Sequence, residues 1–122
     1  MEILALLLLL QIKHWYADFK IQTYMQTVKK GIWLDLIGIS HSLDHVWGTF
    51  LVLLIFNVFY PIEVGAILLV GLIEGTAHYI IDYVKVKHGC KDNTKPLFWN
   101  QFGLDQLAHQ ICYLLIVAYL LF

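Results

Sequence analysis

Long apolar runs separated by short polar breaks form the basic pattern of this chain. Each of four runs reaches the length of about 20 residues that a helix needs to cross a bilayer. They lie at about 3–25, 32–59, 61–86 and 98–122. The pattern predicts an all-α fold, a four-transmembrane-helix bundle that forms a single integral membrane domain over 1–122. We expect the first run to stay in the mature chain, because Glu2 stands where a signal peptide would carry basic residues.

Three polar breaks separate these runs. Lys29, Lys30 and Gly31 form the first break, and 88–96 is the third and most polar. The second break ends at Pro61, which suits the first position of a new helix. Each break therefore predicts a turn between two antiparallel helices.

Composition and charge narrow the class of protein. The chain is 60% hydrophobic and only 14% charged, with a mean hydropathy of +0.70, values typical of membrane proteins. All eight cations are lysines, so we expect no nucleic-acid-binding surface. Lysines lie in or beside the first and third breaks, whereas the second has only Glu63. The positive-inside rule then predicts lysine-rich loops in the cytoplasm and both termini outside.

Histidines and carboxylates recur at a spacing of four residues inside the apolar runs. Nine such groups form four clusters: His14 and Asp18; His41 and His45; Glu74, His78 and Asp82; Asp105 and His109. Because four residues make one helical turn plus about 40°, each cluster occupies one helix face. At about 1.5 Å per residue, all nine lie in one band roughly 8 to 21 Å from the cytoplasmic helix ends. Ionisable groups within membrane spans are expensive and mark functional sites, so we predict that the clusters meet.

The charge of these clusters suggests metal ions. Four acids with five neutral imidazoles carry a charge of −4, and buried charges must be paired, protonated or metal-bound. Lys13 and Lys20 adjoin the first cluster but are expected to point to other faces, and the chain has no arginine. Two divalent metal ions would balance the charge, and nitrogen and oxygen donors without thiolate favour zinc, with iron, manganese or cobalt as alternatives. We therefore predict an intramembrane His/carboxylate metal site in which all nine groups are candidate ligands.

Some of these groups can have other roles. A single His/Asp pair is more simply explained as a hydrogen-bonded pair between helices, and some of the nine can orient ligands rather than bind metal. Glu74 and Asp44 are the candidate catalytic carboxylates, with Glu74 as the general base. Asp44 and Gln22 each lie about one turn from a clustered residue and are candidate partners of the ligands, whereas His88 is expected to be solvated.

Four motifs, taken in order, resemble a known family. They are HWYADFKIQ at 14–22, HSLDH at 41–45, EGTAHYIIDYVK at 74–85 and FGLDQLAH at 102–109. They resemble domain-of-unknown-function family 3307, small bacterial and phage membrane proteins without a settled activity. The resemblance implies a location in the bacterial inner (cytoplasmic) membrane, with a phage origin open. A looser similarity, in topology and histidine-rich spans, links the chain to membrane-bound metal-dependent hydrolases.

These observations lead to one main functional hypothesis and three alternatives. The main hypothesis is an intramembrane di-metal hydrolase, with a metal-bound water as nucleophile. It would act from the cytoplasmic leaflet on a lipid or lipid-linked substrate that enters sideways from the bilayer. The alternatives are a membrane di-iron oxidative enzyme (hydroxylase or desaturase), a metal or proton transporter built as a homo-oligomer, and a phage membrane interaction protein with a structural metal. The sequence leaves the substrate, the metal and the oligomeric state open.

Overall fold

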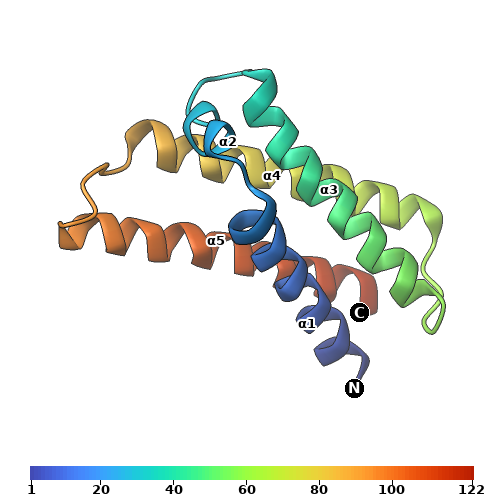
Figure 1. Ribbon diagram of the computed structural model, residues 1–122. Coiled ribbons are helices and arrows are strands. Elements are labelled where there is room, and N and C mark those ends of the chain that lie inside the picture. The colour runs from blue at the N-terminus through green and yellow to red at the C-terminus, as the bar shows by residue number, and fades with distance from the viewer.

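The structure is a computed structural model that describes residues 1–122, and it is all helical (Figure 1). Its elements are α1 (Glu2–Trp15), the π-helix η1 (Tyr16–Ile21), α2 (Tyr24–Lys29), α3 (Leu36–Asn57), α4 (Val64–His88) and α5 (Pro96–Leu121). Three of them, α3, α4 and α5, are long and apolar enough to cross a membrane. The prediction of an all-α chain with several apolar spans is thus confirmed, with three helices that qualify as spans.

The first predicted span, 3–25, is not one helix. α1 runs into the wider π-turn of η1, and the chain leaves the helix at Gln22. Thr23 then begins α2 through a capping box: its Oγ1 accepts from the Gln26 backbone N–H at 3.2 Å, and the Gln26 side chain accepts from the Thr23 N–H at 2.8 Å. These local bonds satisfy backbone groups that a continuing helix would have used, so the first continuous helical segment ends at Ile21.

Other helix ends are also set by side chains. Asp35 accepts hydrogen bonds from the first backbone N–H groups of α3, so this helix begins later than predicted. The Asn57 side chain accepts from the Ile62 N–H at 2.5 Å and closes the α3–α4 turn. Pro61 lies before the start of α4, so its predicted place at the first helical position is wrong, whereas Pro96 does begin α5.

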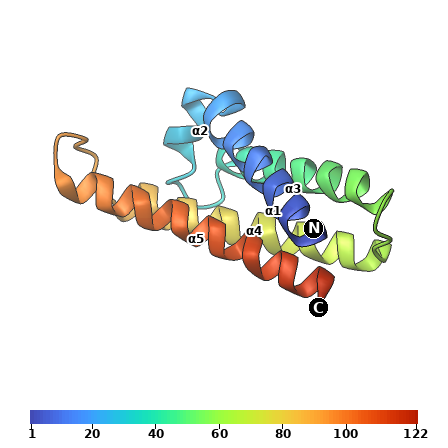
Figure 2. The same ribbon diagram turned by 90° about the horizontal axis from the view of Figure 1, so that it is seen from below.

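The four long elements form a closed ring in which α1 contacts α3, α3 contacts α4, α4 contacts α5, and α5 contacts α1. Both termini lie at the same end of the molecule as the α3–α4 turn, while α2 and the α4–α5 loop lie away from them (Figures 1 and 2). Gly71 and Gly75 of α4 let it approach α3 closely, because an added Cβ would collide with Phe50 and Val46. The ring therefore holds four helical faces around one interior.

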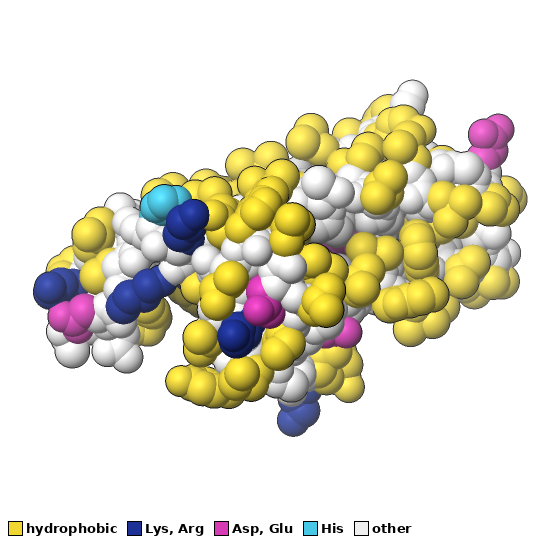
Figure 3. All heavy atoms as spheres, turned by 90° about the horizontal axis from the view of Figure 1, so that it is seen from above, with side chains coloured by type: hydrophobic (Ala, Val, Ile, Leu, Met, Phe, Trp, Pro, Cys, Tyr) yellow, Lys and Arg dark blue, Asp and Glu magenta, His cyan; other side chains and the backbone are white.

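That interior has an apolar half and a polar half. The apolar core lies toward the termini and contains Leu6, Leu10, Val52, Leu53, Phe56, Ile67, Val70, Tyr113, Ile116 and Val117. The predicted histidine and carboxylate clusters fill the other half. The outside is largely apolar, with lysines gathered toward one end (Figure 3). An apolar exterior around a polar interior is the arrangement that a bilayer favours.

Candidate metal centre

The structure brings all four predicted clusters into one buried network. Its members come from α1, η1, α3, α4 and α5, and all nine side chains are buried. His41 and His45 are completely inaccessible, and the ninth side chain, Asp18, is 7% exposed. The prediction that the clusters meet is confirmed, while their role as metal ligands stays a prediction.

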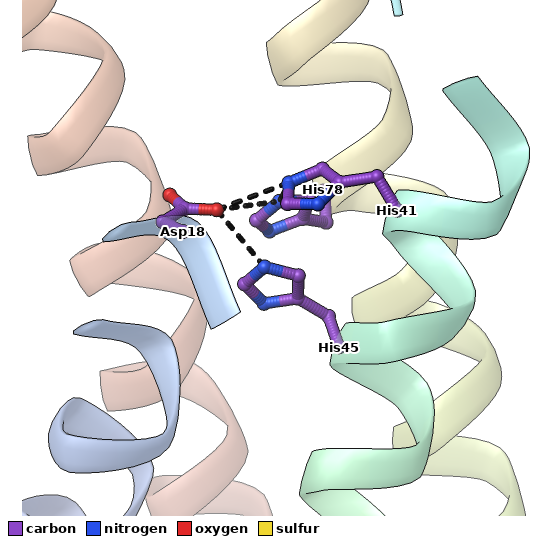
Figure 4. A group of neighbouring side chains, drawn as sticks. All are labelled: Asp18, His41, His45 and His78. Atoms are coloured by element: carbon purple, nitrogen blue, oxygen red, sulfur yellow. Dashed lines mark hydrogen bonds and ion pairs between the residues drawn. The ribbon is translucent and has the colours of Figure 1, made fainter. Parts of the chain in front are cut away.

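Four residues that could hold a metal ion surround one point, and we call them the first donor group: Asp18, His41, His45 and His78. Asp18 on η1 faces the three histidines of α3 and α4 (Figure 4). Its Oδ1 lies 3.0 Å from Nε2 of both His41 and His45, and 3.6 Å from Nε2 of His78. Three imidazole nitrogens thus converge on one carboxylate oxygen.

His41 Nε2 has more polar neighbours than one ring nitrogen can satisfy. Besides Asp18, it lies 3.2 Å from His78 Nε2, 3.3 Å from Asp82 Oδ2 and 2.7 Å from Gln22 Nε2. A ring nitrogen carries either one proton or one lone pair. Donor atoms crowded in this way are typical of ligands that share a cation.

A second donor group, His78, Asp82 and His109, lies beside the first and shares His78 with it. His109 Nε2 is 3.7 Å from Asp82 Oδ1 and 3.8 Å from Asp105 Oδ1, beyond ordinary hydrogen-bond distance. Both His109 Nε2 and Asp105 Oδ1 are buried without any hydrogen-bond partner. Such unpaired polar atoms are rare in protein interiors and call for an explanation.

The Asp82 carboxylate lies between the two donor groups. Its Oδ2 is 3.3 Å from Nε2 of both His41 and His78, while its Oδ1 faces His109. Carboxylates in this position are common in helical bundles that bind two metals. Asp82 therefore lies within reach of donors from both groups.

Lysines occupy the interior more than the sequence suggested. Lys13 is buried, and its Nζ lies 2.5 Å from Glu74 Oε1, so the expectation that it points to another face is wrong. Gly48 makes this possible, because a Cβ there would lie only 2.7 Å from Cγ of Lys13. The methylene groups of Lys13 use that space on α3.

Two more lysines reach the acids of the network. Lys30 Nζ is 2.9 Å from Asp82 Oδ2, and Lys85 Nζ is 3.7 Å from Asp105 Oδ2. Together with the Lys13 pair, three of the four acids have a lysine partner, which reduces the expected charge of −4 to −1. A remaining charge of −1 does not require two divalent ions. The prediction of a metal site therefore depends on the geometry of the donor atoms.

Glu74 lies outside both donor groups and is fully occupied by hydrogen bonds. Its Oε1 accepts from Lys13 and, at 3.0 Å, from the Tyr113 hydroxyl, while its Oε2 accepts from the Thr49 hydroxyl. Thr49 and Tyr113 were missed in the sequence. Each continues a cluster by four residues, Thr49 after His45 and Tyr113 after His109, and that signal could have found them.

The remaining candidates lie at the edge of the network. Gln22 contacts His41 as predicted, whereas Asp44 accepts from the Gln26 side chain at 2.9 Å and makes no hydrogen bond or ion pair with a predicted ligand. His88 is exposed, as expected. The catalytic roles of Glu74 and Asp44 stay predictions.

Fold and site together define an all-helical protein with apolar membrane-span candidates and buried His/Asp groups that could bind metal. The chain belongs to the family described as protein of unknown function (DUF3307), which matches residues 4–122. This confirms the family resemblance over essentially the whole chain. No curated protein matches the chain, and no solved structure matches it.

Proposed function

We propose that this protein is an intramembrane metallohydrolase that holds two divalent ions and acts on a lipid or lipid-linked substrate. The observation that supports it best is the pair of unpaired buried atoms, Asp105 Oδ1 and His109 Nε2, next to Asp82. Donors that bind one ion at about 2.0–2.2 Å lie about 3–4 Å from one another. The separations of 3.7 and 3.8 Å, too long for hydrogen bonds, suit that geometry.

The two donor groups suit different tasks. His78 belongs to both donor groups, but its facing ring nitrogen can bind only one ion. Together with Asp18, His41 and His45 it gives four protein donors with no open position, as in structural zinc sites. Asp82 and His109 of the second donor group, with Asp105 Oδ1 3.8 Å from His109 Nε2, then offer fewer than four donors and leave an open position, as in catalytic sites. An ion there would polarise the scissile bond and make a coordinated water nucleophilic at neutral pH.

Asp105 is better placed than Glu74 to act in the reaction. Glu74 accepts from three donors, and its Lys13 partner lies 3.5 Å from His45 Nδ1, so its contacts suit positioning of the first donor group. Asp105 keeps a free oxygen. It can bind the second ion or accept a proton from water.

Metal analysis of the full chain in detergent tests the site. We expect two zinc ions per chain in the parent protein, and fewer in His45→Ala and His109→Ala. His88→Ala is the matched control, because this exposed histidine lies outside the network, and it should keep both ions. Parent protein without bound metal would overturn the proposal, and iron with an oxo-bridge absorption would favour the oxidative enzyme.

Hydrolysis is tested with zinc-loaded protein in vesicles of phosphatidylethanolamine and phosphatidylglycerol. We expect mass spectrometry to detect released fatty acid or headgroup, and Asp105→Asn to abolish the release. If Asp105→Asn also loses one zinc, Asp105 is a ligand; if it keeps both, Asp105 accepts the proton. Zinc binding without release of any product would contradict the hydrolase assignment.

A purely structural metal is the second candidate. It is favoured by the first donor group, whose four donors leave no open position for substrate. In that case zinc would raise the melting temperature, and Asp105→Asn would leave the zinc content and every measured activity unchanged.

A further inference from the structure

A groove between α4 and α5 leads from the apolar outer surface to the polar interior. It has a volume of about 410 Å³, and its walls include Ile80, Val84 and Leu104, with Asp105 also lining it. The three apolar side chains are about half exposed, whereas Asp105 is 6% exposed. The volume falls within the range of about 300–1,000 Å³ typical of small-molecule sites. The groove thus joins the lipid-facing surface to the carboxylate with the unpaired oxygen.

A lysine stands at the mouth of this groove. The Lys85 side chain also lines it and is 26% exposed. Its Nζ lies 3.7 Å from Asp105 Oδ2 and 5.1 Å from the centre of the Phe102 ring. A cation therefore lies beside the apolar walls, in a groove that His88 and Gln101 also line.

We infer that the groove binds one acyl chain of an anionic membrane lipid, whose phosphate or carboxylate headgroup contacts Lys85. Apolar walls suit the chain, and a lysine at the mouth suits an anion near the membrane surface. A lipid placed this way would bring the bonds next to its headgroup close to Asp105. This inference rests on the proposed function and names its substrate class.

Binding is measured by native mass spectrometry of the full chain in a non-ionic detergent, using three oleoyl probes. Lysophosphatidic acid and oleate carry anionic heads, while lysophosphatidylcholine carries a zwitterionic one. We expect at least one anionic probe to bind about tenfold tighter than lysophosphatidylcholine, as one charge-assisted contact would give. The anionic probe that binds more tightly shows whether the preferred headgroup is a phosphate or a carboxylate. Equal binding of all three probes would overturn the inference.

Two variants locate the site. Lys85→Gln should weaken the anionic probe about tenfold and leave lysophosphatidylcholine unchanged, while Lys91→Gln, the same charge change at an exposed loop lysine, should bind like the parent. Ala108→Phe, on the groove wall, should weaken all three probes. If Lys85→Gln does not fold, Lys85→Arg should retain the preference for the anionic probe. Parent-like binding by folded Lys85→Gln, or by Ala108→Phe, would place the lipid elsewhere.

The same measurement on protein stripped of metal with EDTA separates this inference from the proposed function. Of the residues that line the groove, only Asp105 is a proposed metal ligand, and Lys85 and the apolar wall residues belong to neither donor group, so the preference for anionic probes should persist. Absence of the preference in untreated parent protein that binds zinc normally would overturn the lipid site alone. A normal preference in a protein that binds no metal would overturn the metal site alone.

Discussion

Lys13 changes the electrostatics of the whole interior through one side chain. Its ammonium group is buried beside Glu74, and its methylene groups lie against Gly48. A buried charge is tolerated only when it is paired. The sequence places Lys13 next to His14 but cannot show that α3 leaves a space for it, because that space depends on the packing of two helices.

Removing Lys13 should therefore destabilise the fold. Lys13→Met leaves the Glu74 carboxylate buried with only hydroxyl partners, and loss of one partner of a buried pair costs about 3–5 kcal/mol. Thermal unfolding in detergent, followed by circular dichroism, measures the change. The double variant Lys13→Met/Glu74→Met should recover most of the stability. A double variant no more stable than Lys13→Met would show that the pair is not what matters.

Gly48 allows a second test of the same contact. Gly48→Val should push the Lys13 methylenes away, because even a Cβ there would lie 2.7 Å from Lys13 Cγ. Gly103, where an added Cβ meets nothing within 4 Å, provides the control. We expect Gly48→Val to lower the melting temperature and Gly103→Val to change it much less. Equal effects at the two positions would contradict this role of Gly48.

At the level of elements, regular features were predictable and local departures were not. Spacing of four residues correctly predicted that the histidine and carboxylate clusters share helix faces that meet. The π-helix η1 has no comparable signal in the sequence. Its wider turn carries Asp18, whose contact with His41 on α3 depends on the tertiary packing. The sequence does carry a signal for the start of α2, the capping box of Thr23 and Gln26. Because this capping box lies inside an apolar run, the hydrophobic pattern predicts a single span across it.

The register of η1 should control the first donor group. Deleting Phe19, which is 54% exposed, would convert the π-turn toward an α-turn and change the direction in which the Asp18 side chain projects from it. We expect this deletion to remove metal from the first donor group while circular dichroism still reports a helical protein. Deletion of Asn93, in the exposed α4–α5 loop, should leave the metal content unchanged. Normal zinc content after the Phe19 deletion would contradict this role of η1.

For the whole molecule, the arrangement of the ends bears on membrane orientation. The termini and the α3–α4 turn lie at one end, and the lysine-bearing α4–α5 loop lies away from them (Figure 2). The positive-inside rule places that loop in the cytoplasm. The fourth crossing, by α1 and η1 together, and the orientation itself remain predictions.

Cysteine labelling tests the orientation. A membrane-impermeant maleimide should label Cys90, in the α4–α5 loop, only from the cytoplasmic side of sealed vesicles, with Cys112→Ser removing the second thiol. In a background without other cysteines, Glu63→Cys, in the exposed α3–α4 turn, should be labelled only from the opposite side. Labelling of both positions from one side would contradict the predicted topology.

Metal binding should stabilise the molecule as a whole, because donors from α3, α4, α5 and η1 meet at the site. Zinc at a hundred times its dissociation constant adds about 2.7 kcal/mol if only the folded chain binds it. The melting temperature should rise with zinc and fall after EDTA treatment. His45→Ala/His78→Ala should show neither response.

The separation of the interior into an apolar half and a polar half has a practical consequence for protein design. Residues such as Leu53 and Val117 belong to a cluster of buried apolar side chains toward the termini, and Tyr113 connects this cluster to the polar half through its hydroxyl. A designer could treat that half as a fixed scaffold and rewrite the other with new ligand sets. The same small bundle could then carry designed metal sites within an apolar exterior.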